Sequence, residues 1–197
     1  VAQGADYQTN ILNGNFKNSN LAKLVRKIGY GSLDIEQMNK RARFVDFAPY
    51  EPKGNAPAAF IAKGVKISNS LLGKTSHTSR TNLGSQLVVA LQLSDSTLNE
   101  VMLQRTGLGE TGESYLVGPD FKLRTSTRDP KRNLASSLSG DVALNGADTE
   151  PVRLALEGQS DTGLYQNYNS DWVLASFSPI EVHDQTWALI TEIQASE

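Results

Sequence analysis

Three glycines of the sequence match the spacing of a nucleotide-binding loop. Gly107, Gly109 and Gly112 fit the pattern G-x-G-x-x-G letter for letter. In that motif a strand precedes the glycines and a helix follows them, because the helix N-terminus binds the pyrophosphate. Here we expect a helix before the glycines and a strand after them, so we interpret them as a helix stop and a connector. An enzyme that uses the 107–112 glycines for a nucleotide stays open as an alternative function.

Two further patterns are typical of hydrolytic chemistry. The triplet Asp-Thr-Gly at 161–163 occurs in aspartic proteases, where two copies meet and their carboxylates share a proton. This sequence has one copy, and we interpret it as a turn that leads into a strand. The two histidines, His77 and His183, lack the spaced partners of a metal site or a catalytic triad. We therefore expect no catalytic residue, no metal site and no cofactor.

Aromatic and acidic residues lie on both sides of a Pro/Gly connection in the first half of the chain. A pocket for a small molecule needs apolar walls and a few placed polar groups. The candidate ligand-binding residues are Phe44, Asp46, Phe47, Tyr50, Pro57 and Phe60. The carboxylate of Asp46 could pair with an ammonium group of the ligand. The alternative is that these residues form the edge of a core with one solvated aspartate.

The second half offers a smaller set by the same argument. Tyr115, Arg124, Arg128 and Trp172 combine aromatic surface with positive charge. We treat them as a secondary candidate site for ligand binding. The alternative is that they only pack and pair within the fold.

The composition is that of a globular protein that does not bind nucleic acid. The 197 residues include 19 Lys and Arg against 21 Asp and Glu, and the charges are dispersed along the chain. No basic stripe for nucleic acid is present. The absence of cysteine excludes disulfides and thiolate metal sites. Apolar runs such as Leu87–Leu91 are too short to span a membrane, and Val1 does not begin a signal peptide. We expect that the segments that target or anchor the parent protein lie outside this chain.

The hydrophobic periodicity predicts alternating helical and extended segments. Leu21, Leu24, Val25 and Ile28 share one helical face, and beyond Lys40 the period changes to two. The expected helices are 19–28, 33–40, 96–105 and 151–156. The expected strands are 43–50, 58–67, 86–93, 113–117, 122–126, 163–168, 172–180 and 185–193. A polar stretch, 68–85, is expected to form a long exposed loop.

The two halves repeat one arrangement, a helix followed by three antiparallel strands. This repeat predicts two domains, at 1–95 and 96–197. The second domain has two additional strands, 113–117 and 122–126, before its helical segment. The equivalent strands of the first domain would lie upstream of Val1, so we expect that the first domain is truncated at its N-terminal side.

Several segments resemble one family of bacterial receptors. The most specific is RTGLGETGESYLVGPD at 105–120, followed by RTSTR at 124–128. FVDFAPY at 44–50 with APAAFIA at 56–62, WALITEI at 187–193 and DYQTNIL at 6–12 also fit the pattern. Together they resemble the double-Cache extracytoplasmic sensor domains of methyl-accepting chemotaxis proteins and related receptors.

The resemblance implies an α/β fold, α+β in stricter usage, with tandem PAS-like modules whose antiparallel sheets are flanked by helices. It implies a periplasmic location, a small-molecule ligand bound most often by the membrane-distal module, and a membrane-anchored parent that forms a homodimer. The implied function is ligand sensing and transmembrane signal transduction in chemotaxis, without enzymatic activity. A secreted carbohydrate-binding or adhesion module is a further alternative.

The chain departs from the family pattern in three places. The long N-terminal helix and the first strands of the distal module are absent. The amino-acid-binding signature of many such receptors, a Tyr and an Arg followed by a Trp-Tyr pair, is not visible. The loop at 68–85 is longer than usual. Amino acids are therefore not the expected ligand on the basis of sequence.

Overall fold

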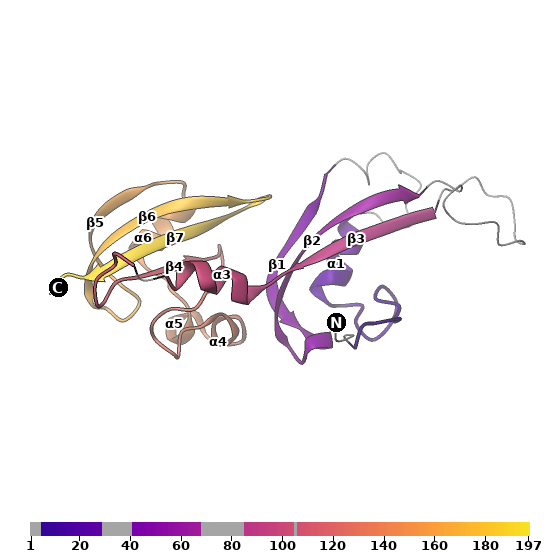
Figure 1. Cartoon of the computed structure of the whole chain (residues 1–197), viewed down its shortest axis with the longest axis horizontal. Coiled ribbons are helices and arrows are strands. Elements are labelled where there is room, and N and C mark those ends of the chain that lie inside the picture. The colour runs from indigo at the N-terminus through magenta and orange to yellow at the C-terminus, as the bar shows by residue number, and fades with distance from the viewer. Residues whose placement is uncertain (1–4, 29–40, 68–84, 105) are drawn as a thin grey trace, which may run out of the picture. The chain divides into compact units, whose positions relative to one another are not determined.

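The computed structural model describes residues 5–28, 41–67, 85–104 and 106–197 (Figure 1). The chain divides into two compact units, unit 1 with residues 1–46 and 50–93, and unit 2 with residues 47–49 and 94–197. The predicted helix 33–40 lies outside the described residues, as does the predicted loop 68–85 except for Ser85. No helix in the described residues is long and apolar enough to cross a membrane.

Unit 1 contains one described α-helix, a short 3-10 turn and a three-stranded sheet. These elements are α1 (Asn20–Ile28), β1 (Arg43–Tyr50), η1 (Glu51–Lys53), β2 (Ala56–Ile67) and β3 (Ser85–Leu93), and the strand order is β1-β2-β3. The antiparallel pairing of β2 and β3 places Ala62 opposite Ala90. The predicted helix 19–28 and the predicted strands 43–50, 58–67 and 86–93 are thus confirmed to within two residues at each boundary.

The helix α1 forms where the sequence places apolar residues on one face. Its buried side chains include Leu24, Val25 and Ile28. The helix packs against β2, and Leu24 and Ile28 belong to the core of unit 1. The hydroxyl of Ser19 accepts a hydrogen bond from the Ala22 amide at 3.2 Å, which satisfies one of the free amides at the helix start. The start of the helix and its buried face therefore agree with the sequence pattern.

Unit 2 contains a four-stranded antiparallel sheet and four described helices. The elements are α3 (Asp95–Met102), β4 (Glu113–Val117), α4 (Leu134–Ser139), α5 (Val142–Asn145), α6 (Glu150–Leu156), β5 (Asp161–Gln166), β6 (Trp172–Val182) and β7 (Gln185–Gln194). The strand order is β4-β7-β6-β5, so the first strand of the sheet pairs with the last strand of the chain. This crossover brings the start of β4 beside the end of β7.

The core of unit 2 lies between the sheet and α6. Along β6 the side chains alternate, with Val173, Ala175 and Phe177 buried and Trp172 and Leu174 exposed. Such period-two burial is what a sheet with one covered face requires. The helix α6 packs against β6 and β7 and closes the core.

The predicted strand 122–126 is wrong. The segment has only one isolated bridge, between Val117 and Leu123. Two backbone hydrogen bonds join it to β4 and the following turn, from the Arg124 amide to the Leu116 carbonyl and from the Gly118 amide to the Lys122 carbonyl. Side chains accept from other amides of the segment: the Leu123 amide donates to Ser137 Oγ at 2.8 Å, and the Ser126 amide donates to Asn99 Oδ1 at 2.7 Å. A polar β-like sequence therefore runs as an irregular segment because other elements supply its hydrogen-bond partners.

The helices α4 and α5 were not expected from the sequence. The side chain of Asn133 accepts from the Ser136 amide, and the side chain of Ser136 accepts from the Asn133 amide, which is a capping box. Asp141 caps α5 by accepting from the Ala143 amide at 2.7 Å. Both helices are short and lack a long apolar periodicity. Their capping residues are the only sequence feature that indicates them.

The fold class is confirmed. Each unit has an antiparallel sheet with flanking helices, which is an α+β architecture. The domain boundaries at 95 and 96 stay a prediction.

Candidate functional site

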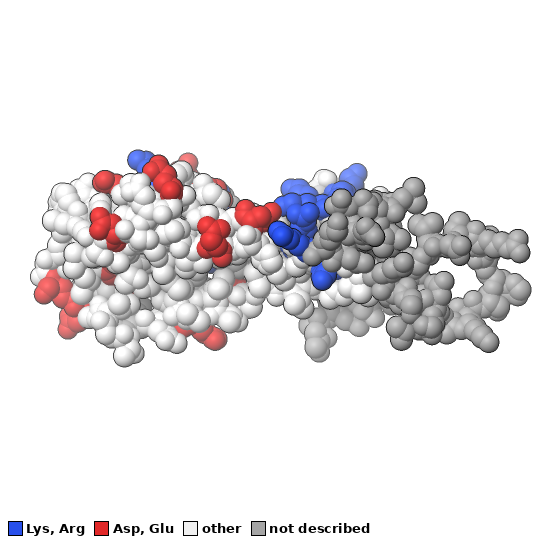
Figure 2. Space-filling view, turned by 90° about the horizontal axis from the view of Figure 1, so that it is seen from above, with Lys and Arg blue, Asp and Glu red and all other residues white. Residues whose placement is uncertain are grey.

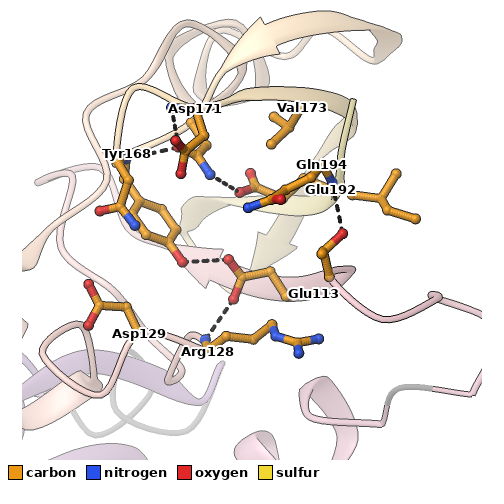
Figure 3. Close-up of a pocket in the computed structure, with 12 residues that line it drawn as sticks. Glu113, Arg128, Asp129, Tyr168, Asp171, Val173, Glu192 and Gln194 are labelled. Atoms are coloured by element: carbon orange, nitrogen blue, oxygen red, sulfur yellow. Dashed lines mark hydrogen bonds between the residues drawn. The ribbon is translucent and has the colours of Figure 1, made fainter. Parts of the chain in front are cut away.

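One cavity of unit 2 lies where β4 begins and β7 ends (Figure 3). It has a volume of about 350 Å³, within the range of small-molecule sites. Its lining residues are Thr111, Glu113, Arg128, Asp129, Asn167, Tyr168, Asn169, Asp171, Val173, Glu192, Ile193 and Gln194. They come from the connector before β4, the segment after residue 127, the β5–β6 turn and the strands β4, β6 and β7.

Two carboxylates form the inner wall of this cavity and lie side by side on neighbouring strands. Glu113 on β4 and Glu192 on β7 are direct partners in the antiparallel register. Their side chains are only 8% and 5% exposed. Like charges directly opposite each other destabilise a sheet, and burial adds a desolvation cost.

Each oxygen of Glu113 accepts one hydrogen bond from the protein. The Tyr168 hydroxyl donates to Oε1 at 2.5 Å, and the Arg128 amide donates to Oε2 at 2.7 Å. Figure 3 shows Glu113 held between Tyr168 and Arg128. Burial and this hydrogen bond raise the pKa of the Tyr168 hydroxyl, so Tyr168 stays a donor at physiological pH.

Glu192 is held in the same way by one tyrosine and one amide. The Tyr115 hydroxyl donates to Oε2 at 2.8 Å, and Asn167 Nδ2 donates to Oε1 at 3.0 Å. Burial raises the pKa of the Glu192 carboxyl to about 7, and the charges of Glu113 and Asp171 act in the same direction, against the two hydrogen bonds. Glu192 therefore exchanges a proton with solvent near neutral pH.

The β5–β6 turn is built around Asn167. Its side-chain carbonyl accepts from the amides of Asn169 and Asp171 at 2.9 and 3.1 Å, while its amide nitrogen donates to Glu192. Ser170 adopts a left-handed conformation with φ of 65°. This turn is also the part of the cavity wall that fixes Glu192.

Arg132 supports this turn from behind the cavity. Its buried guanidinium donates to the carbonyl oxygens of Gly146, Ala143 and Tyr168, the last at 3.1 Å. The same group lies 4.8 Å from the centre of the Tyr168 ring. A cation at this distance from a ring face is attracted by the ring quadrupole, so Arg132 also positions Tyr168.

The charge of the cavity is predominantly negative. Glu113, Asp129, Asp171 and Glu192 line it, against one cation, Arg128. No ion pair between a cationic side chain and Glu113 or Glu192 is present within the described part of the chain. Nor do the described residues contain a group of three or more His, Cys, Asp or Glu side chains placed to hold a metal ion.

Arg128 directs its side chain to the edge of the cavity. Its Nη1 donates to the carbonyl oxygen of Gly112 at 3.1 Å. Its charge also contributes, after hydrogen bonds from Thr111 and Glu110, to a lowered pKa of the Glu197 carboxyl. The one cation that lines the cavity is therefore engaged with the connector and the C-terminal residue.

Unit 1 has a larger and more apolar cavity. Its volume is about 680 Å³, and its lining residues are Gln8, Thr9, Asn10, Ile11, Leu12, Asn13, Leu21, Val25, Leu87, Val88 and Ala90. Asn10 Oδ1 accepts hydrogen bonds from the Leu12 and Asn13 amides, which shapes the polar side of the wall. No charged side chain lines this cavity.

The six primary candidate residues do not line either cavity. Phe44, Tyr50 and Phe60 are buried, and the rings of Tyr50 and Phe60 stack edge to face with centroids 5.0 Å apart. Tyr50 donates to Asp6 Oδ2 at 2.5 Å, and burial raises the pKa of its hydroxyl. The structure thus places this part of the set in the core of unit 1.

The other three members of the set lie on β1 and β2. Asp46 and Pro57 are half-buried. Phe47 is buried in unit 2, with its ring centroid 6.3 Å from that of Trp187. A role of these residues in ligand binding stays a prediction.

Of the secondary candidates, the structure brings two to the acidic cavity of unit 2. Arg128 lines it, and Tyr115 lies behind Glu192 with its hydroxyl bonded to that carboxylate. Arg124 is buried beside Asp120, with an Nη2–Oδ1 distance of 2.9 Å. Trp172 is 57% exposed and lines a separate hollow with Tyr165 and other residues.

Glu113 and Glu192 were missed by the sequence reasoning, although one signal pointed to Glu192. Ala188, Ile190 and Glu192 occupy alternate positions of β7, and the first two face the core. A charged residue that continues the inward face of a strand is unusual and marks a functional candidate. Glu113 had no such signal because it opens its strand.

The glycines at 107–112 are not followed by a helix. The strand β4 begins at Glu113, and Gly107 and Gly109 have positive φ. The turn that they form presents the amides of Glu110 and Thr111 to the Glu197 carboxylate at 2.8 and 2.9 Å, and the Thr111 hydroxyl donates to the same group. This geometry supports the interpretation as a connector, because the amides between the glycines bind a carboxylate of their own chain.

No known family model and no curated protein matches the sequence. The fold resembles the periplasmic sensory domain of the Campylobacter jejuni chemoreceptor Tlp1, with 14% identity, a TM-score of 0.56, and coverage of 94% of this chain and 56% of that one. It also resembles the ligand-binding domain of the Pseudomonas aeruginosa PAO1 amino acid chemoreceptors PctB in complex with L-Arg, with 13% identity, a TM-score of 0.50, and coverage of 99% and 64%. The chain spans less than two thirds of either structure. The likeness confirms the PAS-like fold class of bacterial chemoreceptor sensor domains.

Proposed function

We propose that this chain is the extracytoplasmic sensing part of a membrane-anchored bacterial receptor of the chemotaxis type, with the double-Cache arrangement of modules. The acidic cavity of unit 2 is its candidate ligand site. The observation that carries the proposal is the pair of buried carboxylates, Glu113 and Glu192, that are opposed across two strands at the wall of a cavity. The fold likeness to chemoreceptor sensor domains supports it.

The carboxylate pair is a poor solution for stability alone. Taking one ionised carboxylate out of water costs on the order of several kcal/mol, and apolar residues of similar volume often serve a core better. The positions of Glu113 and Glu192 are held by two tyrosines and an asparagine whose hydrogen bonds orient them toward one cavity. Buried groups of like charge that hydrogen bonds hold in a fixed orientation are typical of binding sites.

The sensing mechanism follows from the elements that carry the cavity. A ligand between the two carboxylates would contact β4, β7 and the β5–β6 turn at once. If the receptor has two conformations that differ in the spacing of these elements, the ligand shifts their populations by its difference in affinity. In a receptor whose membrane helix follows β7, that strand passes the change to the membrane.

The parent protein is proposed to be a periplasmic-facing homodimer with residues 1–95 as the membrane-distal and residues 96–197 as the membrane-proximal module. Two measurements on the full-length protein test this. Protease added outside spheroplasts should cleave within 1–197, and cross-linking in membranes should give a dimer. Protection from external protease would contradict the extracytoplasmic location.

The binding function is tested by a thermal-shift screen of this chain against amines, organic acids, amino acids and neutral sugars. We expect at least one class to raise the melting temperature of the wild type. The increase should be lost in both Glu113→Gln and Glu192→Gln and kept in Glu157→Gln, a matched substitution of an exposed residue. No stabilisation by any class, or stabilisation that survives in both variants, would contradict a ligand site in this cavity.

A further inference from the structure

We propose that the cavity of unit 2 takes a small organic cation with a primary ammonium group, bound between Glu113 and Glu192. This inference rests on the proposed sensing function and names its ligand class. It starts from a buried pair of acceptors without a counter-ion among the described residues. A ligand that brings one positive charge would supply that counter-ion.

The hydrogen-bonding capacity of the two carboxylates fits an ammonium group. Each carboxylate has about four acceptor positions, and the protein uses two on Glu113 and two on Glu192. An ammonium group has three donors and no acceptor, so it can bond to both carboxylates together. Figure 3 shows the two carboxylates on the same side of the sheet, at the cavity wall.

The remaining lining residues fit the rest of such a ligand. Val173 is buried and Ile193 half-buried at the cavity wall, and they offer apolar surface to an alkyl chain. Thr111, Asn169 and Gln194 supply polar groups at the rim. A site with apolar walls and a few placed polar groups is the usual design for a small molecule.

An anionic ligand fits this cavity less well. It would face four acidic side chains and one arginine whose Nη1 is already bonded to the Gly112 carbonyl. A zwitterion would leave its carboxylate beside Asp129 or Asp171. The charge of the lining therefore selects against a carboxylate on the ligand.

Protons compete with the proposed ligand, so binding depends on pH. Glu192 must be ionised to pair with an ammonium group, and its pKa of about 7 leaves it largely protonated at pH 6. The titratable and charged groups that surround it are Glu113 and Tyr115 from β4, Tyr168 and Asp171 from the β5–β6 turn, and Arg128 and Asp129 from the segment after residue 127. Affinity for the amine should rise as pH increases from 6 to 8.

Isothermal titration calorimetry with three isosteric probes tests the charge selection. Butylamine, 1-butanol and butyrate share a four-carbon chain and differ in the head group. We expect heat of binding from butylamine at millimolar concentration and none from the other two. The affinity for butylamine should increase about tenfold between pH 6 and pH 8, following the ionised fraction of Glu192.

Variants locate the binding. Glu192→Gln should weaken butylamine binding at least about tenfold at pH 8 and remove its pH dependence, and Glu113→Gln should weaken it similarly. Glu157→Gln is the matched control and should bind as the wild type does. If Glu192→Gln fails to fold, Glu113→Gln and the pH dependence of the wild type carry the test.

Three results would overturn the inference. They are equal binding of 1-butanol or butyrate, butylamine binding that both variants retain, and binding of calcium chloride in place of the amine. If another ligand class stabilises the chain and the same variants abolish the effect, the sensing function stands and only the amine class falls. If no class binds, both proposals fall.

Discussion

Glu192 is a carboxylate at a position where the strand pattern calls for an apolar side chain. Its neighbours along the inward face of β7 are Ala188 and Ile190, and its partner across the sheet is Glu113. The tyrosine and asparagine that hydrogen-bond to it offset only part of the desolvation cost, so its pKa stays raised. A raised pKa in the folded state has a direct consequence for stability.

The wild-type chain should lose stability as pH rises through neutrality. The folded state holds the Glu192 proton up to pH about 7 and the unfolded state releases it near pH 4.5. Between these values the folded state binds more protons, so the free energy of unfolding falls with rising pH. For Glu192 alone the loss is about 2 to 3 kcal/mol between about pH 5 and about pH 8.

Urea denaturation of the wild type and Glu192→Gln over this pH range measures the effect. The stability of the variant relative to the wild type should increase with pH, because the variant has no proton to lose. Glu157→Gln should follow the wild type throughout. A constant difference between wild type and Glu192→Gln from pH 5 to pH 8 would show that Glu192 titrates normally.

Asn167 offers a second test at the scale of one residue. Asn167→Asp keeps an acceptor for the Asn169 and Asp171 amides but replaces the donor to Glu192 with a carboxylate. The pKa of Glu192 should therefore rise further above 7. The carboxyl carbon shift of Glu192, followed by NMR against pH, reports this value. Asn55→Asp in unit 1 is the control, and an unchanged midpoint in Asn167→Asp would contradict the role of the amide.

Most elements with a clear periodicity were predictable from the sequence. The helix at 20–28 and the strands β1, β2, β3, β4, β6 and β7 are confirmed within a few residues. All of them except β3 have one buried face, whereas β3 exposes Leu87, Val89 and Leu91. The segment 122–126 has a similar composition but no neighbouring strand on its open side. Tertiary side chains, Ser137 and Asn99 among them, complete its hydrogen bonds, and sequence periodicity carries no information about such partners.

Removal of the side-chain acceptor of the Leu123 amide should lower the free energy of unfolding. Ser137→Ala leaves the buried Leu123 amide without its acceptor. An unsatisfied buried donor costs about 1 to 3 kcal/mol. Chemical denaturation should show this loss, whereas Ser139→Ala, which removes an exposed hydroxyl from the same helix, should change stability little. Equal effects of the two substitutions would contradict the assignment of Ser137 as a structural acceptor.

The turn that carries Asn167 and Tyr168 depends on Arg132. Arg132→Lys cannot reproduce a planar group that reaches three carbonyl oxygens and stacks on a ring. We expect a loss of about 2 kcal/mol or more and faster amide exchange over 167–171. Arg153→Lys, at an exposed ion pair with Asp148, is the matched control. Unchanged exchange over 167–171 in Arg132→Lys would show that the turn holds its shape alone.

At the scale of the whole molecule, the sequence predicted the fold class but not the site. The tandem α+β organisation followed from repeated periodicity and from the resemblance to receptor sensor domains. The site depends on the strand order β4-β7-β6-β5, which pairs Glu113 with Glu192 from opposite ends of unit 2. No local pattern encodes that pairing. Two of the residues singled out, Tyr115 and Arg128, belong to its surroundings, whereas Phe44, Tyr50 and Phe60 are buried in the core of unit 1.

The apolar cavity of unit 1 and the acidic cavity of unit 2 differ in the ligands they can hold. The unit 1 cavity is apolar with amide groups, and the unit 2 cavity is lined by four acidic side chains. A hydrophobic or neutral ligand would favour the first and a cation the second. The cavity in which a ligand binds therefore shows which of the two units is the sensing unit.

NMR mapping of a bound amine tests the ligand site in unit 2 most directly. Butylamine is titrated at pH 8 into the isotopically labelled chain, and backbone and carboxyl shifts are followed. We predict that the largest changes occur at Thr111, Glu113, Asn167 and Glu192. Changes confined to the lining of the unit 1 cavity, such as Asn10 and Leu21, or no changes at all, would contradict a sensing site at the opposed carboxylates.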